Sequence, residues 1–524
     1  MKKFLFRTTS LILVTLMLFF TASCVMFNES GDADESENAS KNDNQSDDRY
    51  TEAPAEPSWI ATIPRHEIYF EGAEISIIYR DHISNSREWH KEILEDELDE
   101  AIAVRNTRVQ EELGLNVVWK PLAAGDGYTE YSARFFDEIK ADVDSGKHAY
   151  DISANPVGMS SSLAIRGYSA DLNNTEIFPY FNFELPCWNQ SIVKNTSIYG
   201  ELYFVAGIYN FSMLDSTYFM WFNKDLYDQK RESTDPERIA QYAVEGKWTY
   251  EALHRWTSAF YVNDGSISYE KDDEDTYAFV ANLGDGTPLE AFIYAWDLGF
   301  VIKDEDWHHQ FNVVDNSKAQ TALEKCRELM SAKGTYVSDN VNTFIKGKAL
   351  FCMDKLYPDY EKNNAIREME YRRGLLPIPK YDEKQEEYYT TAEGYFNVTF
   401  ALDHSHSKTP TSGYAISAFL QLTAEEYVNV LGYYFNQTVK PKFFGTDDKE
   451  GTVTLSVAVF DMMLPNIVLD YTKVYDEQLG DINRLWIDAF ADGEKTLEDL
   501  YLADKDSFEA AIKTFDIQLG YRYK

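Results

Sequence analysis

Cysteine is scarce in this chain, with only 4 residues among 524. Beyond Cys24 the cysteines are Cys187, Cys326 and Cys352, an odd number without a CxxC pair. This pattern fits neither a disulfide framework nor a cysteine metal site, so we expect no redox chemistry from these cysteines. One disulfide and free buried thiols are both compatible with it.

Positive charge is also in short supply. Lys and Arg total 49 against 88 Asp and Glu, which gives a formal net charge of -39. Nucleic-acid binding needs clustered cations to neutralise phosphates, so this class of function is excluded. Anionic membrane surfaces and bulky polyanions are equally poor partners. We interpret most of the carboxylates as solvated surface groups.

Several motifs of catalysis and metal binding are missing. The chain has no GxSxG and no HExxH, and His66-Glu67 stands alone. The acidic run at residues 272–275 lacks EF-hand spacing. The histidines at 308–309 and at 404 and 406 lie in polar sequence, where solvated surface histidine is the simpler interpretation. We therefore expect no catalytic residue, no metal and no cofactor. A secreted hydrolase remains the main alternative class of function. The sequence does not identify a glycosidase pair, because acidic residues are too abundant for any two to stand out.

Internal repeats are absent, and Gly and Pro are not in excess, which argues against solenoid, propeller and fibrous architectures. Hydrophobic residues make up 44% of the chain and aromatic residues 15%, enough for a large core. Residues 59–524 exceed the length of one ordinary domain, so we expect more than one folded lobe.

The N-terminus has the parts of a secretory signal. A basic start at residues 1–7 and an apolar run at 11–20 lead to small residues at 21–23, directly before Cys24. The run is shorter than the roughly 20 apolar residues that cross a bilayer. A cysteine at this point resembles the lipobox of bacterial lipoproteins, in which the thiol receives the lipid. The alternative is an ordinary signal peptide followed by an unmodified cysteine.

An acidic segment of low hydrophobicity follows. Residues 28–58 are mostly Asn, Ser, Asp, Glu, Ala and Pro. They cannot bury enough apolar surface to offset the entropy of ordering, so we expect disorder. The sequence thus predicts a signal peptide at 1–23, a lipid-anchored linker at 24–58, and a folded body held at the extracellular face of the cell membrane.

The first part of the body alternates strands and helices. The expected elements are a strand at 74–79, a helix at 87–113, a strand at 115–119, a helix at 132–144 and a strand at 150–154. This order predicts a parallel α/β sheet. Ligands bind such sheets beyond the carboxyl ends of the strands, which points to the loops after Tyr79 and Ala154.

The later part continues in the same style. We expect a strand at 217–222, helices at 250–261, 289–299 and 317–333, a strand at 374–377, and mainly helix from 413 onward. Thr249 is a plausible N-cap, and Gly347 lies at a corner between a helix and a strand.

A series of short motifs, in order, resembles one family. The motifs are RNTRVQEELGLNVVW (105–119), GKHAYDI (146–152), GYSADLNN (167–174), LYFVAG…MWFNKDLY (202–227), GKWTYEAL (246–253), FIKGKALF (344–351), GLLPIPKYDEKQEEYYT (374–390) and GYAIS (413–417). Together they look like the extracellular solute-binding lipoproteins of ABC importers, in the group similar to sugar binders (family 1).

The resemblance implies a two-lobe periplasmic-binding-protein-like (type II) α/β fold with hinge strands and an interlobe cleft. Lobe 1 would comprise residues 59–212 and 375–440, and lobe 2 residues 213–374 and 441–524. Hinges are expected near 209–218, 373–379 and 440–444. The resemblance further implies a monomer that binds a small molecule, most simply a carbohydrate, without catalysis, and that delivers it to the permease subunits of an ABC importer.

Candidate ligand-binding residues follow from position and chemistry, because sugar binders place aromatic faces on the ring and polar groups on the hydroxyls. The aromatic candidates are Tyr209, Trp221, Trp188 and Trp296. The polar candidates at strand ends are Arg80, Asp81, Asn155, Ser160 and Asp354. For the aromatic candidates the alternative is packing in the core, and for the ligand it is an amino acid or peptide clamped by Arg80.

Besides a binding protein and a hydrolase, a surface adhesin is a third possible class of function for the whole protein.

Overall fold

The structure is a computed structural model that describes residues 67–522, except 93, 95–96, 231–237, 266–270, 273, 284–286, 305–308, 339–340, 357–368, 395, 404–411, 427–429 and 431–451. The predicted signal peptide, Cys24, the acidic linker and the hinge at 440–444 lie outside the described residues. His308, His404 and His406 lie outside them as well.

A four-stranded sheet carries the first set of candidate residues. Its strands are β1 (Ala73–Asp81), β2 (Leu115–Ala123), β3 (Ile152–Pro156) and β12 (Asn397–Ala401), in the order β12-β3-β1-β2. β2 and β3 both run parallel to β1, which confirms the predicted parallel α/β pattern. β12 returns from late in the chain and pairs antiparallel with β3.

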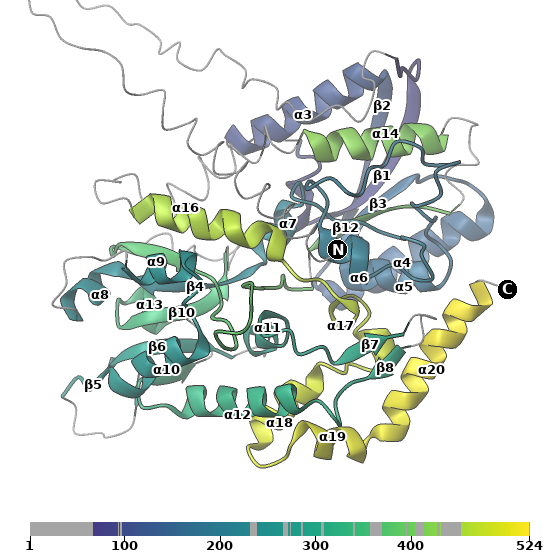
Figure 1. Cartoon of the computed structure of the whole chain (residues 1–524). Coiled ribbons are helices and arrows are strands. Elements are labelled where there is room, and N and C mark those ends of the chain that lie inside the picture. The colour runs from purple at the N-terminus through teal and green to yellow at the C-terminus, as the bar shows by residue number, and fades with distance from the viewer. Residues whose placement is uncertain are drawn as a thin grey trace, which may run out of the picture. The chain divides into compact units, whose positions relative to one another are not determined.

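Helices cover this sheet. They are α2 (Ile83–Ser86), α3 (Glu97–Leu113), α4 (Tyr128–Ser145), α5 (Val157–Ile165) and α14 (Ser412–Glu425). α3 and α14 lie side by side against β2 and β1 (Figure 1), and α5 packs on β3 and β12. α3 begins later than the predicted position 87, because residues 86–90 form hydrogen-bonded turns that bury Glu88 and Trp89.

A second, mixed sheet carries Trp221 and Asp354. Its strands are β4 (Tyr218–Asn223), β5 (Tyr261–Val262), β6 (Thr276–Asn282), β9 (Thr335–Ser338), β10 (Ala349–Lys355) and β11 (Arg373–Leu376). The order is β11-β4-β10-β6-β5, and β9 also pairs with β6. β10 is parallel to β6 and antiparallel to β4.

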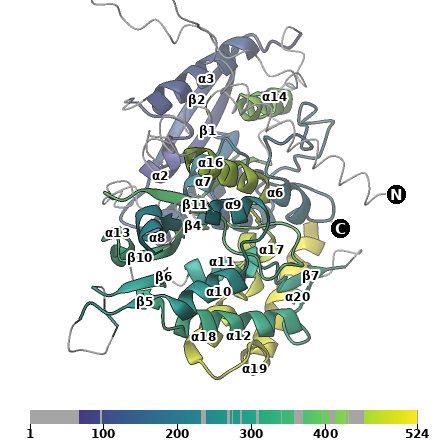
Figure 2. The same ribbon diagram turned by 60° about the vertical axis from the view of Figure 1, so that its left-hand side comes forward.

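The helices around the second sheet follow the predicted pattern closely. They are α8 (Lys224–Lys230), α9 (Arg238–Val244), α10 (Tyr250–Ala259), α11 (Thr287–Ala295), α12 (Ser317–Ser331), α13 (Asn342–Ile345) and α16 (Thr452–Met463). α10 packs on β6, and α12 contacts β9 (Figure 2). Thr249 caps α10 by accepting a hydrogen bond from the Ala252 amide, as predicted.

Short elements complete the described chain. They are α6 (Gln190–Asn195), α7 (Phe211–Asp215), the hairpin of β7 (Val301–Lys303) and β8 (His309–Phe311), η4 (Leu464–Asn466), α17 (Tyr471–Val474), η5 (Glu477–Leu479), α18 (Arg484–Asp492), α19 (Leu497–Ala503) and α20 (Lys505–Arg522). Within the described chain, no helix combines the length and apolar character that crossing a membrane requires.

Three extended segments lie side by side where the chain passes between the two sheets. Thr217 bridges Ala392, and Thr390 bridges Ile467. The Tyr218 amide donates to the Thr391 carbonyl, and the Val468 amide donates to the Thr390 carbonyl at 2.7 Å. We call residues 216–218, 390–393 and 466–468 the connecting segments.

The connecting segments agree only partly with the expected hinges. Residues 216–218 fall at the end of the first expected hinge, at 209–218. The second expected hinge, at 373–379, contains β11, which is a strand of the second sheet, so the pairing occurs later, at 390–393. Hydrophobic pattern alone does not separate a short connecting strand from a sheet strand. The lobe boundaries stay a prediction.

Two minor expectations have clear outcomes. Cys187, Cys326 and Cys352 are free and buried. His309, expected as a solvated surface residue, is buried, and its Nδ1 lies 2.8 Å from Oδ1 of Asp516. The expectation was wrong because β8 places this histidine against Tyr471 and Phe515.

Candidate ligand-binding site

Arg80 and Asp81 end β1 at the carboxyl edge of the first sheet. Arg80 is 8% exposed, and its Nη1 donates to Oδ1 of Asn85 at 3.0 Å. Its guanidinium carbon lies 5.2 Å from the ring centre of Tyr131 and 5.8 Å from that of Tyr128. Asp81 is exposed. A partly covered cation beside an exposed carboxylate can bind paired hydroxyls or a charged ligand group.

Asn155 and Ser160 support this edge from within. The hydroxyl of Tyr131 donates to Oδ1 of Asn155, and Nδ2 of Asn155 donates to the Ile78 carbonyl at 3.2 Å. Ser160 Oγ donates to the Asn155 carbonyl at 3.2 Å. Both residues are fully buried. Asn155 therefore fixes the tyrosine that packs against the Arg80 guanidinium.

Sequence reasoning missed Tyr128 and Tyr131. Both begin α4, immediately after the carboxyl end of β2, and Tyr128 is half-buried. The rule that selected the loops after β1 and β3 applies equally to this loop. Gly125 and Gly127 mark it in the sequence as a turn.

The buried carboxylate of Glu88 ties the loop after β1 to the start of α7 and to the start of β12. Oε2 of Glu88 accepts hydrogen bonds from the Ser212 amide (2.8 Å) and hydroxyl (2.9 Å). Oε1 of Glu88 accepts from Nδ2 of Asn397 at 2.6 Å and from Nδ2 of Asn210 at 3.2 Å. Asn85 donates through Nδ2 to Oδ1 of Asn397 at 3.0 Å. Arg80 therefore reaches Glu88 through Asn85 and Asn397.

Burial dominates the ionisation of this network. It raises the pKa of Glu88 to about 7, although the hydrogen bonds from Ser212, Asn397 and Asn210 each act to lower it. Burial also lowers the pKa of Arg105 to about 10, against the opposing effect of Glu88. Arg105 donates to the Glu88 carbonyl at 2.7 Å. Glu88 is therefore poised to change protonation near neutral pH.

The carboxyl end of β10 forms the matching edge of the second sheet. Nζ of Lys355 lies 2.8 Å from Oε2 of Glu393 in the second connecting segment. The Leu356 amide donates to the Thr217 carbonyl at 2.8 Å. Asp354 is buried, and its Oδ1 accepts from the Lys355 amide at 2.7 Å. Asp354 thus lies one residue from an ion pair that joins β10 to the connecting segments.

The four aromatic candidates are core side chains here, each at most 1% exposed. Their indole and phenol groups bond internally: Trp188 to Gln421, Tyr209 to Thr399, Trp221 to the Lys355 carbonyl and Trp296 to the Pro379 carbonyl. Trp188 and Tyr209 meet edge to face with ring centres 5.8 Å apart. The structure therefore brings Trp188 and Tyr209 together, while ligand contact by any of the four stays a prediction.

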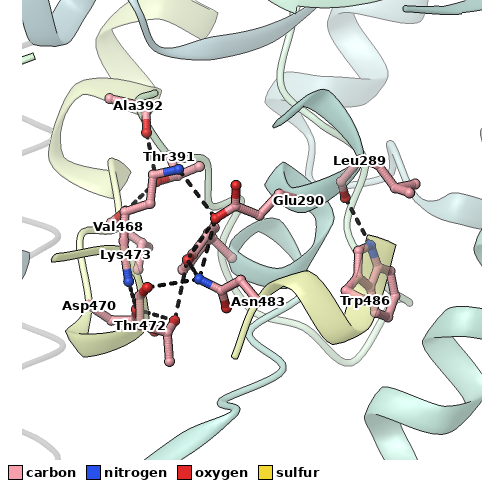
Figure 3. A network of polar contacts seen from close by, with 11 residues as sticks. Leu289, Glu290, Thr391, Ala392, Val468, Asp470, Thr472, Lys473, Asn483 and Trp486 are labelled. Carbon is pink, nitrogen blue, oxygen red and sulfur yellow. Dashed lines mark hydrogen bonds and ion pairs between the residues drawn. The ribbon is translucent and has the colours of Figure 1, made fainter. Parts of the chain in front are cut away.

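A second polar network joins α11 to the chain that follows the connecting segment 466–468 (Figure 3). Oε1 of Glu290 lies 3.3 Å from Nζ of Lys473 and accepts from Nδ2 of Asn483 at 3.3 Å. Thr391 donates through its hydroxyl to the Val468 carbonyl at 2.9 Å. Burial, with Glu290 and Asp481 nearby, raises the pKa of Asp476 to about 8, and Lys473 opposes this.

Two cavities are open to solvent. One, of about 230 Å³, lies along α3, where the ring of His90 stacks on Trp119 with centres 5.3 Å apart. The other, of about 560 Å³, lies at the start of α12. Among the described residues, no group of three His, Cys, Asp or Glu side chains is placed to hold a metal ion.

No protein-family model matches the chain, and no curated protein matches it. Solved structures do. An uncharacterized protein from Listeria monocytogenes EGD-e has 12% identity and a TM-score of 0.51, covering 84% of this chain and 100% of its own. The sugar-binding protein MalE from the phytopathogen Xanthomonas citri has 11% identity and a TM-score of 0.50, covering 86% of this chain and 98% of its own.

These likenesses concern the fold. They span most of this chain and almost all of each neighbour. The predicted α/β periplasmic-binding-protein-like fold is therefore confirmed. A shared fold does not by itself determine what a protein binds.

Proposed function

We propose that this chain is a solute-binding protein that captures a carbohydrate at the facing carboxyl edges of its two sheets and delivers it to an ABC importer. One observation carries the proposal: the carboxyl end of β10 bonds to the connecting segments at Thr217 and Glu393, and the chain runs on from the segment 390–393 into β12 of the first sheet. The fold shared with a sugar-binding protein supports the choice of ligand class. Such a fold has no need of a nucleophile or a cofactor.

Recognition on the first sheet rests on Arg80, Asp81 and Tyr128. Asp81 accepts hydrogen bonds from sugar hydroxyls, Arg80 donates them, and the half-buried Tyr128 ring offers an apolar face. On the second sheet, Asp354 and the Lys355–Glu393 pair lie at the corresponding strand end. Closure of the two edges on a ligand would cover polar groups that are hydrated in its absence.

The direct test uses Asp81, because its exposed side chain contributes little to stability. Binding is measured by thermal shift against glucose, maltose, maltotriose, amino acids and short peptides. We expect a sugar to raise the melting temperature of the wild-type chain, and Asp81→Asn to weaken its apparent affinity about tenfold. Asp137→Asn, an exposed carboxylate on α4, is the control and should leave affinity unchanged.

Three outcomes would contradict the proposal. One is the absence of any stabilising sugar. A second is a sugar that is stabilising at first and is then consumed, which would favour a hydrolase. The third is a response only to amino acids or peptides, which would favour the charge-clamp alternative through Arg80.

The membrane attachment rests on the sequence around Cys24. We infer that Cys24 carries a lipid and that the acidic segment 24–58 tethers the body outside the cell membrane, near the permease subunits. Metabolic labelling with a radioactive fatty acid tests this. Label on the wild type and none on Cys24→Ser is expected; label that survives the substitution would overturn the anchor.

A further inference from the structure

A cavity at the start of α12 has the chemistry of a second ligand site. Its volume is about 560 Å³, which falls within the range of about 300–1,000 Å³ usual for small-molecule pockets. Asp297 and the first turns of α12 form one wall, and the segment from Tyr381 to Tyr389 forms the other. We call it the α12 cavity. It is separate from Arg80 and Asp81 at the end of β1.

The wall formed by the segment 381–389 is rigid. Nε2 of Gln385 donates to the Ala295 carbonyl at 2.9 Å, and its Oε1 accepts from the Tyr381 amide at 3.0 Å. The Tyr381 ring meets Trp296 edge to face at 5.7 Å between centres. Lys325 lies 4.9 Å from the centre of the same ring. A wall held at the C-terminal end of α11 and against Lys325 of α12 is preorganised for binding.

Other polar groups of the cavity remain available to a ligand. Within the described residues, the carboxylate of Asp297 makes no hydrogen bond, and neither does the ammonium group of Lys384. Burial, and after it the charge of Asp297, raises the pKa of Tyr389, so this phenol stays neutral; both side chains line the cavity. Together they offer an acceptor, a donor and a half-buried aromatic ring.

The lining selects among ligand classes. Three carboxylates, those of Asp297, Asp382 and Glu386, outnumber the two lysines of the lining, so its charge gives an anion no advantage. The many polar groups disfavour a purely apolar molecule. A metal ion is disfavoured as well, because the described residues include no group of three ligating side chains. A neutral ring with several hydroxyls satisfies the acceptor, the donor and the aromatic face together.

We propose that the α12 cavity is a second carbohydrate site that takes one sugar unit, with Asp297 and Lys384 binding its hydroxyls and Tyr389 packing on its ring. Tyr389 directly precedes Thr390 in the second connecting segment. An occupant of the cavity therefore sits next to the chain that joins the two sheets.

Hydrogen–deuterium exchange of the purified chain locates both sites separately. The probes are glucose, galactose, maltose, maltotriose, cellobiose and xylobiose. We expect one or more of them to protect peptides covering 317–321 and 381–389. Protection at 79–83 reports on the proposed main site and does not depend on the α12 cavity.

The variants test the assigned roles. Asp297→Asn is suitable because the Asp297 backbone has φ 50, a conformation that asparagine also tolerates. Asp297→Asn and Tyr389→Ala should each raise the sugar concentration needed to protect the cavity peptides at least about tenfold. Tyr389→Phe keeps the ring and should raise the required sugar concentration by less than about threefold.

The inference is overturned if all six sugars leave 317–321 and 381–389 unprotected, whatever happens at 79–83. It is also overturned if Asp297→Asn and Tyr389→Ala fold normally, by unfolding midpoint, yet retain full protection. A third result would also overturn it: protection at 381–389 that appears only together with protection at 79–83 and that neither variant changes. This result would indicate closure of the chain on a ligand in the main site, without a second site.

Discussion

Glu88 and Asn397 lie 309 positions apart in the chain, and Nδ2 of Asn397 donates to Oε1 of Glu88 at 2.6 Å. This bond fastens the loop after β1 to the start of β12. Because Ser212 and Asn210 also donate to Glu88, one carboxylate holds together three segments near the proposed ligand site.

Glu88→Gln should change how stability depends on pH. The folded-state pKa of Glu88 is raised to about 7 from 4.5, so folding favours the protonated carboxyl. Its contribution is fully present below about pH 4.5 and is lost as pH rises through 7. Relative to Glu88→Gln, the wild type should lose up to about 3 kcal/mol of unfolding free energy between pH 4.5 and 8.

Urea denaturation across this pH range measures the difference. Glu494→Gln, at an exposed glutamate, is the control and should track the wild type at every pH. A constant gap between the wild type and Glu88→Gln would show that Glu88 does not titrate in this interval.

Lys355 and Glu393 should couple energetically. Their side chains are 20% and 13% exposed, so water screens the pair only partly. A double-mutant cycle with Lys355→Met and Glu393→Gln should give a coupling of about 1 kcal/mol. The exposed pair Arg484–Asp488 is the matched control and should couple by less than about 0.5 kcal/mol. Equal couplings for the two pairs would contradict a structural role for Lys355–Glu393.

Gly207→Ala should destabilise the chain. A Cβ at this position would lie 2.2 Å from the Cys187 carbonyl oxygen, and this oxygen also accepts from the Ile208 amide. Relieving this clash requires the backbone to move, which should lower the unfolding free energy by about 1–3 kcal/mol or more. Gly394→Ala meets nothing within 4 Å and is the control. Chemical denaturation compares them, and equal midpoints for the two variants would refute the close approach.

Lys473→Met should destabilise the network of Figure 3. Lys473 is 6% exposed and opposes the raised pKa of Asp476. Its loss leaves the half-buried Glu290 without this cation, at a cost of up to about 3 kcal/mol. A carboxyl whose pKa is raised by folding makes the unfolding free energy fall as pH rises. The stability deficit of Lys473→Met relative to the wild type should therefore grow between pH 7 and 9.

The matched control for this variant is Lys495→Met, at an exposed lysine that pairs with Asp492. It should change unfolding free energy by less than about 0.5 kcal/mol. A Lys473→Met deficit that is independent of pH would indicate lost packing alone.

The sequence by itself determined the local elements. Alternation of apolar runs with amphipathic stretches located β1, α3, β2 and β3, and glycine placed the ends: Gly114 and Gly146 both adopt the left-handed conformation beyond a helix. These features depend on neighbouring residues, so periodicity and capping reveal them. The fold class follows from their order.

Only the tertiary structure decided which side chains are covered. Trp188, Tyr209, Trp221 and Trp296 have the right chemistry for sugar binding, but contacts with residues far along the chain bury them. The same holds for Glu88, whose carboxylate has hydrogen-bond partners more than 120 positions away. Burial and long-range pairing depend on how distant segments pack, and a local pattern carries no information about that.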